Sequence, residues 1–304
     1  MPLPTAQLLK HKAAFYQRIR HFFSEREVLE VDTPLVADAA ITDVHIEPIV
    51  TSAGKYLQTS PEYAMKRLLV QGSGDIYQLC KAFRHEELGK KHREEFTILE
   101  WYRQGFDQWD LMEEVADLME VLLGTTYVKH LSYRQAFDEY LGIDPFTISD
   151  SDLAREARQH IDVQMGFASR DDWLDLLMSH LIEPYLGEDA PTFIYDYPPS
   201  QAALAIIKND EQGQAVAERF ELYYRGLELC NGYHELADAA QLRQRFEFDN
   251  LNRQKLGKQS LPLDEAFLTA MDKGMPACAG VAMGVDRLLM LSLNSQDIAD
   301  TQAP

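Results

Sequence analysis

The stretch IYQLCKAFRHE (76–86), followed after a charged segment by EFTILEWYR (95–103), decides the fold that the sequence predicts. β-Branched and aromatic residues recur in both runs, which favours two β-strands. The charged residues 87–94 between them favour an antiparallel hairpin with a long tip. Because side chains alternate between the two faces of a strand, Arg84 and Glu86 are expected to share one face of the first strand. The same alternation places on one face of the second strand Phe96, Ile98, Glu100 and Tyr102.

Helical and strand patterns surround the hairpin. Residues 5–26 repeat apolar side chains at helical spacing, and residues 107–123 do so behind Asp107, a typical N-cap. Further strands are expected at 28–36, 192–197, 220–224, 227–235 and 279–284, and a further helix at 285–293. Antiparallel strands with helices set apart indicate an α+β fold. We therefore predict one catalytic-type domain over residues 1–304, with a helical insertion at 142–190.

Composition limits the classes of protein to which the chain can belong. The 304 residues carry 49 acidic and 29 basic side chains, a formal net charge of −20, which opposes broad contact with nucleic acid backbones. Three scattered cysteines are too few for a disulfide framework or a zinc site. The sequence shows no membrane-spanning run and no signal peptide, so we expect a cytoplasmic protein without a membrane partner.

Basic and aromatic side chains on the hairpin indicate a nucleotide site that lacks the usual glycine-rich motifs. The sequence contains neither a Walker loop nor a Gly-x-Gly-x-x-Gly motif. In the hairpin, Arg84 is suited to an α-phosphate and Phe96 to stacking on a purine. The tip residues His92 and Arg93 are suited to the outer phosphates. Taken singly, each of these residues also fits a surface salt bridge or a core aromatic.

Three motifs in a fixed order make the pattern specific. They are FRHE (83–86) with EFTILE (95–100), Glu228-x-x-Asn231-x-x-x-Glu235, and Gly280-x-x-x-Gly284-x-Asp-Arg287. Together they resemble motifs 2 and 3 of the class II aminoacyl-tRNA synthetases, with residues 28–36 as motif 1. The residue choices are similar to those of the lysyl branch. The resemblance covers residues 10–293 outside the insertion.

The resemblance implies an enzyme that uses ATP and Mg²⁺. It implies that Arg84 and Arg287 are catalytic and that Glu221 and Glu228 hold the metal, since carboxylate oxygens suit magnesium. Phe96 and Arg287 would enclose the adenine from opposite faces. The ATP-binding residues that it implies are Arg84, His85, Glu86, His92, Arg93, Phe96, Glu228, Leu229, Gly284 and Arg287.

An amino acid with a side-chain ammonium is expected in the pocket, because a buried ammonium needs carboxylate partners. Glu100 and Glu235 are the expected partners. The resemblance also places at the substrate Ser60, Pro61, Glu62, Tyr102, Asn231, Tyr233 and Ala282. Ser60 to Glu62 equally fits a simple helix start. Regular alternation puts Glu228 out of phase with Asn231, so a bulge or turn is expected at Asn231-Gly232.

The acceptor of the activated amino acid is not named by these residues. Fewer than 30 residues precede motif 1 and only a short tail follows Arg287, so we expect no anticodon-binding domain and no tRNA anticodon contact. In this the chain resembles the elongation factor P lysine lysyltransferase family, which implies (R)-β-lysine as substrate, elongation factor P as acceptor and a homodimer. The alternatives are a stand-alone enzyme that charges an RNA, an amide-forming relative such as ammonia-dependent asparagine synthetase, and an inactive regulatory paralogue.

Overall fold

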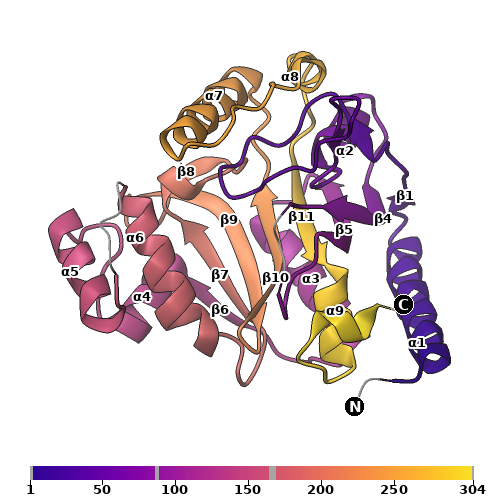
Figure 1. Ribbon diagram of the computed structural model, residues 1–304, viewed down its shortest axis with the longest axis horizontal. Helices are drawn as coiled ribbons and strands as arrows, with labels where there is room; N and C mark the ends of the chain where they lie inside the picture. Colours follow the sequence, from indigo (N-terminus) through magenta and orange to yellow (C-terminus); the bar gives the residue numbers. More distant parts are fainter. Residues whose placement is uncertain (1–2, 86–88, 164–168, 303–304) are drawn as a thin grey trace. The chain divides into compact units, whose positions relative to one another are not determined.

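The predicted hairpin is present in the computed structural model, which describes residues 3–85, 89–163 and 169–302 (Figure 1). Strand β4 (Ile76–Phe83) pairs antiparallel with β5 (Glu95–Gln104). The first strand ends at Phe83, earlier than predicted, where the charged tip begins. The Arg84 amide still donates to the Glu94 carbonyl, with N and O 2.9 Å apart.

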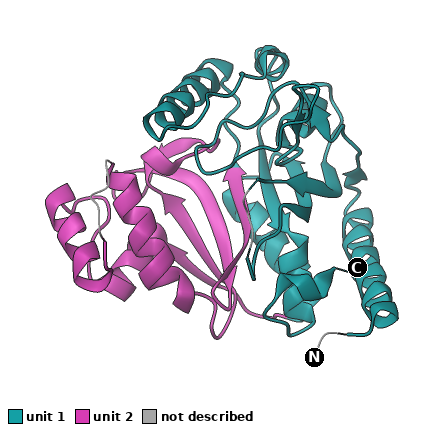
Figure 2. Ribbon diagram, viewed as in Figure 1, with its two compact units in different colours: residues 1–124, 234–304 teal, residues 125–233 magenta. Residues whose placement is uncertain are grey.

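Two units divide the chain, and each is described by itself (Figure 2). Unit 1 comprises residues 1–124 and 234–304, and unit 2 comprises residues 125–233. The helices and strands of unit 1, besides the hairpin, are α1 (Thr5–Glu25), β1 (Leu29–Glu30), β2 (Val36–Ala37), β3 (Tyr56–Leu57), α2 (Glu62–Val70), α3 (Gln108–Leu123), α7 (Ala239–Lys255), α8 (Glu265–Met271), β11 (Cys278–Gly284), α9 (Val285–Ser292) and the 3₁₀ turn η4 (Ile298–Thr301).

The sheet of unit 1 has the strand order β1-β4-β5-β11. Helices α1 and α3 cover one face of it: the Trp101 indole N–H donates to Glu114 of α3 at 2.9 Å, and Phe23 of α1 meets the Trp101 ring edge-on. Asp107 caps α3 as predicted, accepting from two backbone amides, and the apolar stripe of α3 is buried. The opposite face of β5 is thereby left for polar side chains.

Strand register decides which polar residues share that face. Glu100 lies directly opposite Gln78 on β4 and Ala282 on β11, and Tyr102 lies opposite Gly280. Cross-strand partners point to the same side of a sheet. The predicted grouping of Phe96, Ile98, Glu100 and Tyr102 on one face of β5 is therefore confirmed, and part of β11 lies on the same face.

The single strand predicted at 28–36 is wrong. Two short strands occur instead, β1 pairing parallel with β4 and β2 pairing with β3. Thr33 and Pro34 lie between them outside any strand. Proline has no N–H to donate to a ladder, which explains why the strand breaks there.

Unit 2 contains helices and strands that pair antiparallel, except that the strand Lys129–Ser132 runs parallel to its neighbour Thr192–Tyr197. Its elements are β6 (Lys129–Ser132), α4 (Tyr133–Leu141), α5 (Asp150–His160), α6 (Arg170–Leu177), the π-turn η1 (Met178–Ile182), the 3₁₀ turns η2 (Glu183–Tyr185) and η3 (Pro199–Gln201), β7 (Thr192–Tyr197), β8 (Ile207–Asn209), β9 (Ala215–Tyr224) and β10 (Leu227–His234). Strand β9 pairs with β7, β8 and β10, all antiparallel. The tight turn between β9 and β10 uses positive φ at Arg225 and Gly226, which suits a two-residue hairpin.

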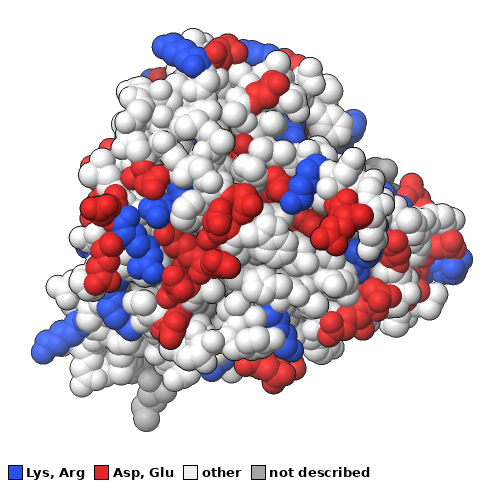
Figure 3. Space-filling view, turned by 180° about the vertical axis from the view of Figure 1, so that it is seen from behind, with Lys and Arg blue, Asp and Glu red and all other residues white. Residues whose placement is uncertain are grey.

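The surface reflects the acidic composition of the chain. In the view of Figure 3, acidic side chains are spread widely, with basic side chains among them. In the part of the chain that the structure describes, no helix is both long and apolar enough to cross a membrane.

Candidate active site

A buried carboxylate without an ion-pair partner lies at the centre of the polar face of unit 1. Glu100 is 1% exposed. Ser60 Oγ donates to its Oε1 at 2.5 Å and Tyr102 Oη donates to its Oε2 at 3.3 Å. Over residues 3–85, 89–163 and 169–302, no Lys, Arg or His side chain forms a salt bridge with it. Burial, reinforced by the charge of Glu62, raises the pKa of Glu100 to about 8.

The second predicted carboxylate, Glu235, already has a cation partner. Its Oε2 lies 2.5 Å from Nζ of Lys66, and the same Nζ lies 2.6 Å from Oε1 of Glu62. Lys66 is fully buried on α2 and its ammonium lies 5.9 Å from the centre of the Tyr102 ring. Burial raises the pKa of Glu235, and the Lys66 ammonium opposes that rise.

Lys66 was missed by reasoning from the sequence. The only available signal was its position four residues after Glu62, a spacing typical of exposed helical ion pairs. Lysine is almost never fully buried unless it is paired, so the sequence pattern favoured an exposed side chain. The cluster that we call the carboxylate cluster therefore comprises Glu62, Glu100 and Glu235 with Lys66 among them.

Small residues on β11 leave room for this cluster. A Cβ at Gly280 would lie 2.3 Å from the Tyr102 ring and 2.5 Å from Oε1 of Glu235. Glycine is thus required by the close approach of both side chains. Ala282 lies directly opposite Glu100 and places its methyl group on the same face.

The segment from Ser60 to Glu62 leads into helix α2 and also contacts Glu100. Helix α2 begins at Glu62 with Pro61 as the preceding residue, so the helix start is confirmed. Ser60 Oγ accepts from the Glu62 amide at 3.0 Å while it donates to Glu100. One hydroxyl therefore joins the start of α2 to β5.

The hairpin residues assigned to the nucleotide lie near one another. The guanidinium carbon of Arg84 is 5.0 Å from the centre of the Phe96 ring. His85 donates its amide to the Glu47 carbonyl at 2.7 Å, and its Nδ1 lies 3.2 Å from Glu94. Glu86, also assigned to this group, lies outside the described residues.

Arg287 of motif 3 meets the tip of the hairpin. Its Nη2 is 2.6 Å from Nε2 of His92, and its Nε lies 3.5 Å from the Lys91 carbonyl. Arg93 instead turns toward Asp297, 3.9 Å away. The preceding Gly284 is the N-cap of α9. Two of the residues assigned to the phosphates, His92 and Arg287, are therefore in direct contact.

In unit 2, Glu221 is held by a set of hydrogen bonds. Tyr197 donates to its Oε2 at 2.6 Å, and Tyr223 donates to the same oxygen. Arg219 forms an ion pair with Oε1 and also donates to the Asn231 side chain at 3.3 Å. Glu221 is 7% exposed, so its carboxylate is fixed in position before any ligand binds.

An irregularity in β10 was predicted and is present, but earlier than expected. The register shifts between Glu228 and Cys230, not at Asn231-Gly232. Leu229 sits at the shift and is buried. After it, Asn231 lies opposite Glu221 and Tyr233 opposite Arg219, whereas Glu228 lies opposite Tyr223. The shift thus brings Glu228, Asn231 and Tyr233 to the face that carries Glu221.

Comparison with known proteins identifies the family. The sequence model described as "tRNA synthetases class II (D, K and N)" matches residues 4–303. The chain belongs to this family. It is 48% identical over 312 residues to the elongation factor P--(R)-beta-lysine ligase of Edwardsiella ictaluri, covering 99% of this chain and 95% of the relative. Proteins of the same name from Hamiltonella defensa and Salmonella arizonae are 45% and 46% identical, each over 99% of this chain and over 95% and 96% of their own lengths.

The side chains assigned to the metal in this class II chain offer oxygen donors only. Burial, and then the charges of Glu221 and Glu228, raise the pKa of nearby Glu183 to about 7. Among the described residues, no group of three or more His, Cys, Asp or Glu side chains could hold a metal ion. Carboxylate oxygens are ligands of the kind that Mg²⁺ takes, together with phosphates and water.

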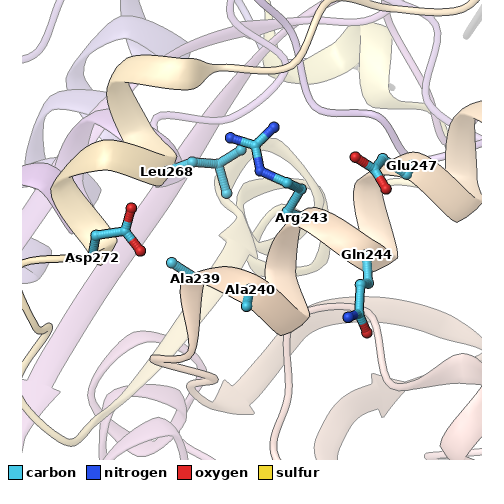
Figure 4. Close-up of a pocket in the computed structure, with 7 residues that line it drawn as sticks. All are labelled: Ala239, Ala240, Arg243, Gln244, Glu247, Leu268 and Asp272. Carbon is cyan, nitrogen blue, oxygen red and sulfur yellow. The ribbon is translucent and has the colours of Figure 1, made fainter.

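A separate hollow lies in unit 1 between α7 and α8 of the class II domain. It has a volume of about 390 Å³ and includes Ala239, Arg243 and Asp272 in its lining (Figure 4). None of the predicted site residues lines it. Arg243 pairs with Glu265 at its edge, but both side chains are largely exposed, so solvent screens their charges.

Proposed function

We propose that this class II chain activates (R)-β-lysine with ATP and transfers it to a lysine side chain of elongation factor P. The name carried by the relatives supplies the substrate and the acceptor. Glu100 carries the proposal within the molecule. A buried carboxyl group that has hydroxyl partners and no ion pair is costly to ionise, and a ligand ammonium would favour its ionised form.

The remaining pocket residues are proposed to fix the orientation of the diamino acid. Ser60 and Tyr102 hold the Glu100 carboxylate, and Glu235 supplies a second negative charge. Glu62 at the start of α2 is proposed to meet the other ammonium group. The residues proposed to complete the pocket are Pro61, Asn231, Tyr233 and Ala282.

The nucleotide is proposed to lie against the hairpin. Phe96 stacks on the adenine, and Arg84, which lies over the same ring in the structure, would move to the α-phosphate. Arg287 and His92, in contact with each other, are proposed to hold the outer phosphates, with Arg93 beside them. The residues proposed to complete the ATP site are His85, Glu86, Glu228, Leu229 and Gly284.

The first reaction needs no catalytic proton transfer. The carboxylate of the amino acid is ionised at neutral pH and attacks the α-phosphorus in line. A bond forms between carboxylate oxygen and phosphorus, and the bond to the β-phosphate oxygen breaks to release pyrophosphate. Arg84 and Arg287 offset the developing negative charge. Mg²⁺, held by Glu221 and Glu228, would supply further positive charge to the phosphate oxygens.

The second reaction forms an amide. The neutral amine of the acceptor lysine attacks the carbonyl carbon of the adenylate, AMP departs, and the nitrogen loses a proton.

We place the reaction in the cytoplasm, which is consistent with the three free cysteines, all largely removed from solvent. We also propose that the enzyme acts as a homodimer and that residues 1–304 form one catalytic domain with a helical insertion at 142–190.

The test offers the purified protein ATP, labelled (R)-β-lysine, and either elongation factor P or tRNA. We expect label on elongation factor P, released as a modified lysine after proteolysis. Replacing the acceptor lysine with arginine is the matched control, and it should remove the label. Label on tRNA, or none on either acceptor, would refute the proposal.

A further inference from the structure

Lys66 is a buried cation within the carboxylate cluster that the proposed reaction does not use. It lies on α2, is fully buried, and contacts both Glu62 and Glu235. Burying an ammonium side chain costs several kcal/mol unless the charge is paired. Two carboxylate partners, 2.5 and 2.6 Å away, raise the pKa of Lys66, so its ammonium stays charged.

The carboxylate cluster has a net negative charge when all of its groups are ionised. Three carboxylates, Glu62, Glu100 and Glu235, face one ammonium, so the ionised cluster carries 3 − 1 = 2 negative charges. A diamino acid brings two ammonium groups. The residual charge of the cluster therefore equals the charge that such a substrate supplies.

Glu235 depends on Lys66 for its charge. The ionisable groups that face Glu235 are Lys66 and Glu62 from α2, Glu100 and Tyr102 from β5, and Cys278 from β11. Lys66 is the cation among these described groups. Without it, Glu235 would face two carboxylates in a buried setting with no opposing charge, which would favour its protonated form further. A protonated Glu235 offers a ligand ammonium no negative charge.

We propose that Lys66 is a positioning residue for the diamino acid: it pairs with Glu235, favours the ionised form of that carboxyl, and holds it aimed into the carboxylate cluster. The inference rests on the proposed function. Lys66 binds Oε2 of Glu235, whereas Oε1 lies on the side of Gly280 and Tyr102. The carboxylate thus presents one oxygen to the protein and the other toward the polar face of the sheet.

The experiment measures ATP–pyrophosphate exchange with (R)-β-lysine for wild type, Lys66→Met, Glu235→Gln and the double variant. At pH 7 we expect Lys66→Met to raise KM for the amino acid by about 30-fold or more, with KM for ATP and kcat little changed. The loss should shrink by up to about tenfold per pH unit as Glu235 regains its charge at higher pH. A residue that only supports the fold would not produce that recovery.

The double variant shows whether Lys66 acts through Glu235. In the Glu235→Gln background, Lys66→Met should add less than about threefold to KM, because residues in one charge pair are not additive. An added loss of tenfold or more would overturn the proposal. If Lys66→Met alone does not fold, the KM values of Glu235→Gln and the double variant still test the proposal. The double variant has a neutral pair of side chains in place of an unpaired buried charge, so it is expected to fold.

Lys81→Met is the matched control. Lys81 also pairs with a glutamate, Glu95 at 3.2 Å, but it projects from the opposite face of β4 and is 39% exposed. Its KM for (R)-β-lysine should equal that of wild type. An unchanged KM in Lys66→Met beside an active wild type would refute this inference alone. A wild type that exchanges no diamino acid would refute the proposed function instead.

Discussion

Binding of the diamino acid at pH 7 is expected to release a proton from Glu100. In the free protein the carboxyl is buried beside the charge of Glu62, and its hydrogen-bond partners are the hydroxyls of Ser60 and Tyr102. A ligand ammonium at this position favours the ionised form and lowers the pKa. The proton must therefore leave as the ammonium enters.

The magnitude follows from the pKa of about 8 in the free protein. About 0.9 of the carboxyl is protonated at pH 7 and about 0.5 at pH 8, so those fractions of a proton should be released on binding. Removing the proton at pH 7 costs about 1.4 kcal/mol, which weakens binding by about tenfold relative to pH 9.

Isothermal titration calorimetry in two buffers of different ionisation enthalpy counts the released protons. Glu100→Gln is the control, because it removes the titrating carboxyl of Glu100 and leaves the other side chains of the carboxylate cluster in place. The difference between wild type and Glu100→Gln should be about 0.9 proton at pH 7 and should fall toward about 0.5 at pH 8. Equal counts for the two proteins would show that Glu100 is ionised before binding or does not meet the ammonium.

Four further predictions test other parts of the site. A carboxyl whose pKa is raised in the folded protein stabilises the fold at pH values below its pKa in the unfolded chain, and this stabilisation is lost as pH rises. The free energy of unfolding of the ligand-free protein should therefore fall by up to about 1.4 kcal/mol per pH unit between about pH 5 and 8. Parallel urea titrations of wild type and Glu100→Gln check this, and the fall should be less steep in the variant. Arg84→Ala and Arg287→Ala should each abolish pyrophosphate exchange and change unfolding by less than about 0.5 kcal/mol, and normal exchange would remove that residue from the site. Gly280→Ala should raise KM for the amino acid at least about tenfold, because its Cβ would displace Tyr102 and Glu235. An unchanged KM would show that these two side chains can shift to make room for the methyl group without loss of binding. Ala282→Gly should improve adenylation of α-lysine relative to β-lysine by about tenfold, because the methyl opposite Glu100 crowds the α position, and an unchanged ratio would contradict this.

Local patterns in the sequence predicted those elements whose causes are local. Asp107 caps α3 because its side chain accepts hydrogen bonds from amides in the first turn of the helix. The acidic cap and the apolar helical repeat that follows it can both be recognised in the sequence. Strand β7 runs from Thr192 to Tyr197 as its aromatic and β-branched residues indicate. The shared face of Phe96, Glu100 and Tyr102 follows from alternation alone.

Features that depend on distant partners were not predictable in the same way. The burial of Lys66 requires Glu235, which is 169 residues away in the sequence. Likewise, if Glu228 and Asn231 are to lie on the same face, the alternation of side chains along β10 requires one irregularity between them. The alternation does not show at which residue the strand register shifts. In the structure the shift falls at Leu229, a buried apolar residue. The roles of the individual site residues in binding stay predictions.

The position of Glu100 in the sheet links the fold to the proposed specificity. Its strand is paired on both edges, with β4 and with β11, so the backbone of Glu100 cannot move away to expose the carboxylate. Its side chain is shared between Ser60 at the start of α2 and Tyr102 on its own strand. The charge can therefore be satisfied only by a proton or by a cation that enters the cluster. An amino acid without a second ammonium leaves the proton in place and gains no ion pair, whereas a diamino acid replaces it. The discrimination would then arise from a rigid β-sheet that holds one carboxylate out of water.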